Sequence, residues 1–385
     1  MVQSNRLSHA LLFLAQEGAG GLPMALAFSQ YLVCESVQKA FLQDVSPSLF
    51  GEPTTKQENP ELPADSCGTC AACLKSAKMV HPDIHFSFPL ITKKDSSSQV
   101  VSNDWITEFR EFVGNMPYGN SFDWLQFINA ENKQGNITAA ECNDIIRKLS
   151  VKSFESGYKV LVMWMPEYLG KEGNKLLKLI EEPPANTLFI LVAENESLIL
   201  QTILSRTQLV KIPKIAAAEM EEALVSKAGL DRSRARQVAV LSEGNYREAL
   251  QQINHASEDW LSLFRDWMNA ILKNGPASQV RWVEEISKLG REKQKQFLRY
   301  CNHMLHVAIR ANLLPGSLDS LPETEADFAA RLNKFTGVSQ QEAMIQEFDK
   351  AAYYIERNAN SKMLFHALTI RVSHIIADKS LILIA

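Results

Sequence analysis

The sequence of 385 residues lacks several features that would assign it to common classes. No apolar run approaches the roughly 18 residues of a membrane-spanning helix. The net charge is −4, so no overall basic field attracts nucleic acid. Six cysteines are too few for a disulfide framework in so long a chain. There is no internal repeat, and no G-x-S-x-G or H-E-x-x-H motif is present. These absences exclude an integral membrane protein and a disulfide scaffold, and they predict a cytoplasmic protein.

The first motif that is present resembles a phosphate-binding loop. A short apolar run, Ala10–Leu14, predicts a buried strand, and an apolar stretch, Pro23–Val33, predicts a helix. Between them lies a glycine-rich turn, A-Q-E-G-A-G-G-L. A strand, a glycine turn and a helix are the frame of the nucleotide-binding P-loop G-x-x-x-x-G-K-[ST].

The chemical groups of that loop are missing. When the turn is aligned on the P-loop pattern, Ala15 replaces the first glycine and Gly20 keeps the second, while Gly18 falls on a variable position. Gly21 occupies the lysine position and Leu22 the Ser/Thr position. The lysine meets the β- and γ-phosphates, and the hydroxyl holds Mg²⁺. Neither glycine nor leucine can replace these groups. The turn therefore predicts an ATPase scaffold that binds no ATP of its own.

A second nucleotide motif is degenerate in the same way. P-loop enzymes carry an acidic residue after a buried strand, where it orients Mg²⁺. The strand predicted at Lys159–Met163 is followed by Trp164 and Met165, which cannot bind Mg²⁺. Glu167 lies three residues further on, and we expect it to begin a loop. The joint loss of both motifs predicts that the chain has no intrinsic ATPase.

The remaining pattern predicts an α/β fold with a parallel sheet covered on both faces. Thr138-Ala-Ala-Glu141 has the form of a capping box that begins a helix, and Pro183-Pro184 ends another. The predicted strands are Ala10–Leu14, Ile84–Phe88, Leu125–Ile128, Lys159–Met163, Leu188–Val192 and Gln208–Ile212. The predicted helices among them are Pro23–Val33, Asp104–Val113, Thr138–Leu149 and Gly173–Ile180.

After Pro213 the strand pattern disappears. Three short helices are expected at Ala216–Lys227, Asp231–Glu243 and Tyr246–Asn254, and the rest is helical except for a polar break at Pro315–Asp327. We therefore predict three domains: an α/β domain over residues 1–212, a small helical lid over 213–255, and an all-helical domain over 256–385. The proline-rich, charged stretch Asp44–Ser66 is expected to be an insertion.

A cluster of cysteines predicts a structural metal site. Cys67, Cys70 and Cys73 have two-residue spacings that suit a tetrahedral zinc ion, which needs a fourth ligand. Cys34, just after the first helix, is the favoured fourth ligand, with His81 and His85 as alternatives. The zinc module would span about residues 34–73. Surface thiols or a redox C-x-x-C pair are less favoured. Cys142 and Cys301 are isolated, and we expect them in helix cores.

Several motifs in order resemble one protein family. They are Ser8-His-Ala-Leu-Leu-Phe13, the triple cysteine, His81-Pro-Asp83, Leu176-Leu-Lys-Leu-Ile-Glu-Glu-Pro-Pro184 and Ile203-Leu-Ser-Arg-Thr207. This set resembles the bacterial clamp-loader branch of AAA+ proteins from about residue 5 to 255. The resemblance implies a P-loop-type AAA+ domain, a helical lid and a C-terminal helical domain that holds a hetero-pentamer together. The cysteine cluster separately predicts a structural Zn ion.

The family contains motor subunits and inactive subunits, and the lost motifs resemble the inactive kind. The family's Ser-Arg-Cys motif corresponds to Ser205-Arg206-Thr207. The resemblance implies that Arg206 acts in trans on the ATP of a neighbouring motor subunit, since guanidinium is always charged and forks toward phosphate. The implied partners are gamma/tau-type motor subunits, a delta subunit, the sliding clamp and primed DNA.

One further arginine, Arg247, lies in a segment of recognisable pattern. The segment Gly244-Asn-Tyr-Arg247 resembles a motif whose arginine faces nucleotide. Without a working P-loop, we expect Arg247 to pack domains together instead.

The alternatives to an inactive clamp-loader subunit are an active motor subunit of the same complex and a zinc-stabilised structural subunit. Binding and turnover of Mg-ATP by the isolated chain would favour the motor.

Overall fold

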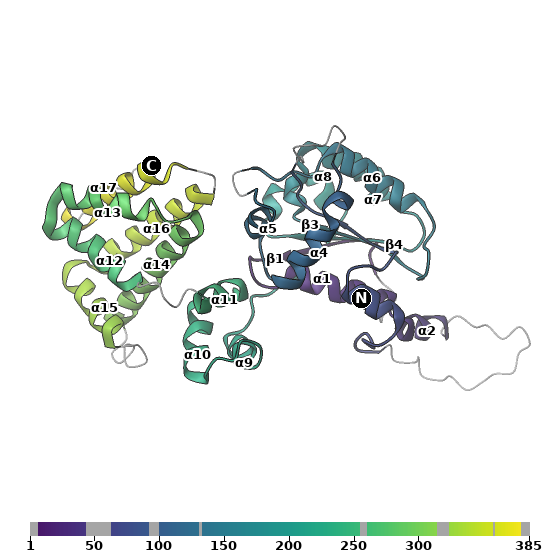
Figure 1. The fold of residues 1–385 in the computed structure, drawn as a ribbon, viewed down its shortest axis with the longest axis horizontal. Helices are drawn as coiled ribbons and strands as arrows, with labels where there is room; N and C mark the ends of the chain where they lie inside the picture. The colour runs from purple at the N-terminus through teal and green to yellow at the C-terminus, as the bar shows by residue number, and fades with distance from the viewer. Residues whose placement is uncertain are drawn as a thin grey trace, which may run out of the picture. The chain divides into compact units, whose positions relative to one another are not determined.

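The computed structural model describes residues 7–43, 63–91, 100–130, 133–254, 260–313, 323–356 and 359–378. The chain forms two compact units, Met1–Ile253 and Asn254–Ala385 (Figure 1). The three-domain division at residues 212 and 255 stays a prediction. Among the described residues, no helix has the length and apolar character needed to cross a membrane. Most of the predicted Asp44–Ser66 insertion lies outside the described residues.

A five-stranded parallel sheet is the centre of the first unit. Its strand order is β2-β3-β4-β1-β5, so the strand that precedes the glycine turn lies between two others. The middle strands are buried along their whole length, as expected for a sheet covered on both faces. The strands are β1 Ala10–Ala15, β2 Ile84–Ser87, β3 Lys159–Trp164, β4 Thr187–Ala193 and β5 Gln208–Ile212.

Alternate residues of β1 pack into two different cores. Leu11 and Phe13 join the core that contains residues of α1, α4 and α5, while Ala10 and Leu12 join the core that contains α6, α7 and α8. This alternation follows from the two-residue period of a strand. The helices are α1 Gly21–Val33, α2 Glu35–Gln43, α3 Ala71–Ala77, η1 Ser102–Trp105, α4 Ile106–Asn115, α5 Ser121–Phe127, α6 Ala139–Ser150, η2 Pro166–Leu176, α7 Leu177–Glu181, η3 Glu196–Leu198 and α8 Gln201–Leu204.

Three short helices complete the first unit: α9 Ala217–Ala228, α10 Arg232–Leu241 and α11 Tyr246–Asn254. Their small core includes Met220, Leu224 and Ala239. Gly229 ends α9 with a left-handed backbone (φ 69°), a conformation that glycine adopts without steric cost. The predicted helices in this segment are confirmed to within a few residues at each end.

The second unit is entirely helical over its described residues. Its core contains Trp267 stacked on Trp282, with ring centroids 4.6 Å apart, and it buries Phe264, Phe297 and Phe348. The predicted fold class, a P-loop-type α/β domain followed by helical segments, is therefore confirmed. The helices are α12 Trp260–Asn269, η4 Ala270–Asn274, α13 Gly275–Ile286, α14 Arg291–Leu313, α15 Glu323–Phe335, α16 Val338–Glu356 and α17 Ser361–Asp378.

Two predicted segments are wrong. The segment Leu125–Ile128 is not a strand, because Leu125 lies inside α5. Asn120 and Asp123 cap the first turn of α5 reciprocally, and a short apolar run suits a buried helix as well as a strand. The polar break at Pro315–Asp327 is too long, since α15 already begins at Glu323.

The predicted capping box before α6 is half formed. Thr138 caps the helix by accepting the N–H of Glu141 at 3.3 Å. The carboxylate of Glu141 does not return to Thr138; it accepts the N–H and the hydroxyl of Ser102, both at 2.7 Å. Burial raises the pKa of Glu141, because charge is disfavoured away from water. This glutamate therefore ties η1 to α6.

Candidate functional site

The glycine turn has the backbone of a phosphate-binding loop. It joins the carboxyl end of β1 to the first residue of α1. Gly18 (φ 68°) and Gly20 (φ 92°) both adopt the left-handed region that favours glycine. Gly20 is the N-cap of α1, and no side chain caps the helix there. The predicted frame is therefore present, and the N–H groups of the first turn of α1 belong to it.

The hollow beside this turn is nearly filled. It is lined by the turn together with Tyr118, Trp164, Met165 and Glu194, and it leaves about 20 Å³ of free space. That volume admits about one water molecule. A Cβ added to Gly20 would lie 3.1 Å from the ring of Tyr118, which shows how closely this tyrosine covers the turn.

Packing occupies the two positions where a P-loop holds its cation and its hydroxyl. Gly21 is buried, and a Cβ there would lie 2.9 Å from the Cβ of Ala15 and 3.1 Å from Val192. Leu22 is 4% exposed and belongs to the core formed with residues of β1, α4 and α5. The lost lysine and hydroxyl are thus replaced by close contacts between β1, β4 and α1.

The second degenerate motif is also buried. Trp164 packs against the rings of Phe109 and Phe112, with centroids 5.7 and 5.8 Å away. Met165 has a positive φ of 58° and precedes η2. Both side chains are about 3% exposed. The position of the metal-orienting acid therefore carries an aromatic core residue.

Glu167 has a structural task in this region. It lies in the helix η2, so the expectation that it begins a loop is wrong. One carboxylate oxygen accepts the backbone N–H groups of Glu194 (2.6 Å) and Asn195 (2.8 Å). Burial raises the pKa of Glu167 above its usual range. The carboxylate holds the loop after β4 against η2.

Arg247 of α11 forms a buried ion-pair cluster. It is 4% exposed, and it binds both carboxylate oxygens of Asp123, one of them at 2.6 Å from Nη2. Its Nη1 donates to Glu17 in the glycine turn at 2.9 Å. The residue before it in α11, Tyr246, donates its N–H to the carbonyl of Gly18 at 3.0 Å. The predicted packing role of Arg247 is confirmed, and it fastens α11 to the turn.

Arg206 lies far from this turn. It follows α8 and precedes the amino end of β5, where Gln208 is level with Leu11 of β1 in the parallel register. The glycine turn follows the opposite, carboxyl end of β1. At about 3.3 Å per residue, the sheet separates the two positions by roughly 15–20 Å. The arginine is 33% exposed, so it is open to a partner but not placed to serve its own turn.

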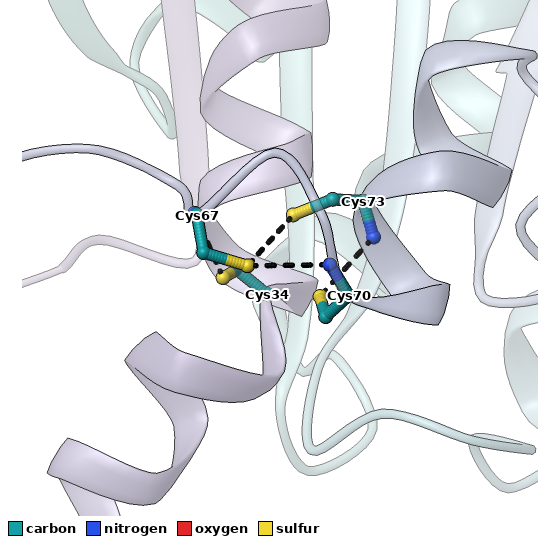
Figure 2. A group of neighbouring side chains, drawn as sticks. All are labelled: Cys34, Cys67, Cys70 and Cys73. Carbon is teal, nitrogen blue, oxygen red and sulfur yellow. Dashed lines mark hydrogen bonds between the residues drawn. The ribbon is translucent and has the colours of Figure 1, made fainter.

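The four predicted zinc ligands come together (Figure 2). Cys34 follows α1, Cys67 precedes α3, Cys70 is the N-cap of α3, and Cys73 lies in its first turn. All four Sγ atoms lie within 4.8 Å of one another, and those of Cys67 and Cys73 are 4.0 Å apart. Tetrahedral zinc with Zn–S bonds of about 2.3 Å needs sulfurs about 3.8 Å apart, so the group fits this ion.

Backbone donors support the sulfurs. The N–H of Cys67 donates to Cys34 Sγ at 3.3 Å, that of Cys70 to Cys67 Sγ at 3.4 Å, and that of Cys73 to Cys70 Sγ at 3.4 Å. Donors from Thr69 and Cys70 lower the pKa of Cys67 to about 5. Burial raises the pKa of Cys73 to about 12, a penalty that a bound cation would offset. Four thiolates would leave no open coordination position.

The alternative ligands and isolated cysteines lie outside this cluster. His81 is 3% exposed, and its Nδ1 accepts the N–H of Asp83 at 3.2 Å. His85 lies in β2, where burial lowers its pKa to about 4. Neither belongs to the group of Sγ atoms. Cys142 and Cys301 are fully buried in α6 and α14, as predicted.

Three residues of the first unit were missed in the sequence. Tyr118 gave no signal, because its role depends on the fold around it. Asp123 was overlooked because the residues just after it, Leu125–Ile128, were predicted as a strand, although Asn120 three residues earlier is a helix cap. Glu181 lies within the Leu176–Pro184 motif without a predicted role, and its carboxylate accepts the Nε–H of Arg206 at 2.5 Å. Each acts through a contact with a segment distant in sequence.

The comparison with protein families decides the relationship. A family model described as "DNA polymerase III, delta subunit" matches residues 1–216. The chain belongs to this family. This match confirms the predicted resemblance of the motifs to bacterial clamp-loader proteins.

Two curated relatives of this chain have low sequence identity to it. DNA polymerase III subunit delta' of Bacillus subtilis (strain 168) is 22% identical over 227 residues, which are 59% of this chain and 48% of the relative. DNA polymerase III subunit gamma of Buchnera aphidicola subsp. Acyrthosiphon pisum (strain APS) is 23% identical over 191 residues, covering 44% and 53%. The chain spans about half the length of these curated relatives.

Solved structures resemble this DNA polymerase III delta-family chain only loosely. A gamma subunit-related protein from Thermotoga maritima is 13% identical, with 97% of this chain and 96% of that one covered and a TM-score of 0.38. The Bacillus subtilis DNA clamp loader delta protein is 12% identical, with coverages of 60% and 82% and a TM-score of 0.25. Likenesses this weak carry no argument about function.

Proposed function

We propose that this chain is an ATPase-inactive clamp-loader subunit of the delta-prime type, within a DNA polymerase III holoenzyme of the cytoplasm. It contributes Arg206 in trans to the ATP site of a neighbouring motor subunit. The observation that carries the proposal is the glycine turn. Its cation position is a buried glycine without room for a side chain, and its hydroxyl position is a core leucine.

Three further features support the loss of nucleotide chemistry. The hollow beside the turn has room for about one water molecule. Trp164 stands where a Mg²⁺-orienting acid is needed, packed into the aromatic core. Arg247, which would otherwise be free to face a nucleotide, binds Asp123 and Glu17. An active motor subunit would require all three features to change.

The place of Arg206 supports action on another subunit. It lies at the amino end of β5, across the sheet from the chain's own glycine turn. Its guanidinium is partly exposed and always charged. An arginine supplied in trans stabilises the charge that develops on a transferred phosphoryl group. A subunit without its own ATP site can therefore still be needed for hydrolysis next door.

The partners follow from this role. They are gamma/tau-type motor subunits, a delta subunit, the sliding clamp and primed DNA held within the complex. The all-helical second unit would supply the contacts that assemble the complex. Any contact with DNA would be made to backbone phosphates, which position a duplex without reading its sequence.

The test is ATP hydrolysis by the reconstituted complex. Arg206→Ala should leave folding and assembly intact and strongly slow clamp- and DNA-dependent hydrolysis, because the missing group is worth a factor on the order of 10³–10⁵ at the site it serves. Arg232→Ala, which removes an exposed arginine of α10, is the matched control. An unchanged rate for Arg206→Ala contradicts the proposal. So does clear binding and turnover of Mg-ATP by the isolated chain.

The cysteine cluster is proposed to hold one structural zinc. Elemental analysis of the purified chain should find about one zinc per chain, as expected for a Cys₄ site. Cys34→Ser should lower that content and destabilise the segment between α1 and α3. Cys142→Ser, at a buried cysteine outside the cluster, should keep the full content. A folded, metal-free protein contradicts the zinc proposal.

A further inference from the structure

The guanidinium of Arg206 is held by its own chain. Its Nε donates to Oε1 of Glu181 at 2.5 Å, and its Nη2 pairs with the same oxygen. Its Nη1 donates to the carbonyl of Thr202 at 2.8 Å and to the hydroxyl of Ser205 at 3.1 Å. These contacts act on all three nitrogens, so the side chain has a defined position in the isolated subunit.

The elements that carry these partners are fixed to each other. Glu181 is the last residue of α7, and Ile180 beside it is buried in the core that also takes Ile203 of α8. A Cβ on Gly173 would lie 2.9 Å from Ile203, so η2 and α8 are in close contact. Thr202 also donates through its hydroxyl to Asn174 of η2 at 3.3 Å. The carboxylate and the arginine are therefore presented by one rigid support.

The Glu181–Arg206 pair contributes little to stability. Glu181 is 45% exposed and Arg206 is 33% exposed, and exposed pairs contribute about 0–1 kcal/mol. A free arginine side chain, in contrast, has many rotamers to lose when it is fixed against a ligand. When the guanidinium is already held in place, this loss of side-chain entropy no longer opposes binding or reaction of the triphosphate. The benefit of this pair therefore lies in placing the arginine.

We infer that Glu181 is the positioning residue of Arg206. Its carboxylate holds the Nε side of the guanidinium, so that the arginine is in place before the neighbouring subunit's triphosphate arrives. This inference rests on the proposed function of Arg206 in trans. It assigns a task to the first glutamate of the Leu176–Pro184 motif and none to the second, Glu182.

The experiment compares variants of this chain in the complete reconstituted complex with motor subunits, clamp and primed DNA. Glu181→Ala should lower kcat for ATP about tenfold, because a misplaced reacting group can cost up to about 10²-fold in rate, and KM should stay within about twofold. Glu181→Gln keeps an oxygen that accepts the Nε–H, so it should restore most of kcat. Glu182→Ala, at an adjacent exposed residue, should match the parent protein.

A double variant separates positioning from an independent effect. Glu181→Ala combined with Arg206→Ala should be no slower than Arg206→Ala alone, because the carboxylate acts through the arginine. Additive losses overturn the inference. A rate for Glu181→Ala equal to or above that of the parent also overturns it, provided that Arg206→Ala is slow; a faster rate would mean that the carboxylate competes with phosphate. If Arg206→Ala has the parent rate, the proposed function itself is wrong.

Discussion

At the scale of single residues, Gly21 decides what the glycine turn can do. It opens α1 directly against β1 and β4, and the Cβ of Ala15 and a methyl group of Val192 occupy the space where its own side chain would begin. A side chain at this position would require a shift between α1 and the two strands that it packs against. The loss of the cation is therefore built into the packing and is not reversed by one substitution.

The packing at Gly21 predicts a change in stability. Gly21→Ala should lower the free energy of unfolding by about 1–3 kcal/mol, the usual cost of overfilling a packed site. Urea unfolding of the purified chain measures it.

Gly114→Ala is the matched control for this substitution. Gly114 is an exposed helical glycine of α4 with open space around its Cβ position. Replacing it should raise the free energy of unfolding by up to about 1 kcal/mol, because alanine favours helix. Equal midpoints for Gly21→Ala and the parent protein would show that β1, β4 and α1 can separate freely.

At the scale of elements, helix α11 is fastened to the glycine turn. Arg247 joins Asp123 at the start of α5 to Glu17 of the turn, and the N–H of Tyr246 binds the carbonyl of Gly18. The ring of Tyr246 also lies 4.8 Å from that of Tyr118, which covers the turn. Side chains therefore bridge α11, α5 and the glycine turn.

The fastening predicts how α11 responds when its arginine is removed. Arg247→Met should destabilise the first unit by about 3–5 kcal/mol, because it leaves a buried carboxylate unpaired. Hydrogen exchange should rise at α11 and at the glycine turn, where the bond from Tyr246 to Gly18 would open more often.

Arg236→Ala, at an exposed arginine of the neighbouring helix α10, tests whether charge loss alone is enough. It should leave the exchange of α11 unchanged. Equal protection in Arg247→Met and the parent would mean that the hydrophobic core of α9–α11 holds the helices in place without the ion pair.

At the scale of the whole molecule, the chain has two sets of cores. The first unit contains the two cores of the sheet and the small core of α9–α11. The second unit has its own core around Trp267 and Trp282. A unit with its own hydrophobic core can fold alone.

The separate cores predict that the fragments Met1–Ile253 and Asn254–Ala385 each fold when expressed by themselves. Each should unfold cooperatively in urea, as followed by circular dichroism. A cut inside α14, between residues 300 and 301, divides the second core and should give fragments that do not fold. A second unit that is unfolded by itself would show that its stability depends on the first.

The motifs predicted most of the fold because their signals are local. The buried strands, the helix Thr138–Leu149 and the glycine stop at Gly229 each follow from short-range periodicity or backbone preference. The strand at Leu125–Ile128 failed because a four-residue apolar run has no period of its own, and a cap outside it decided for helix. Glu167 was misplaced because Pro166 begins the helix η2 directly after Met165, and proline suits the first position of a helix.

The amino-acid sequence by itself determined which chemical groups the chain has lost and which it keeps: no lysine or hydroxyl in the glycine turn, no acid after β3, four cysteines, and an arginine after Ser205. Only the tertiary structure decided how these groups meet. It brings Arg247 to Asp123 across 124 residues, gathers Cys34 with a cysteine 33 residues later, and places Arg206 across the sheet from the turn. The physical reason is that the type of a residue determines its chemistry, while contacts between distant segments determine which groups its side chain meets.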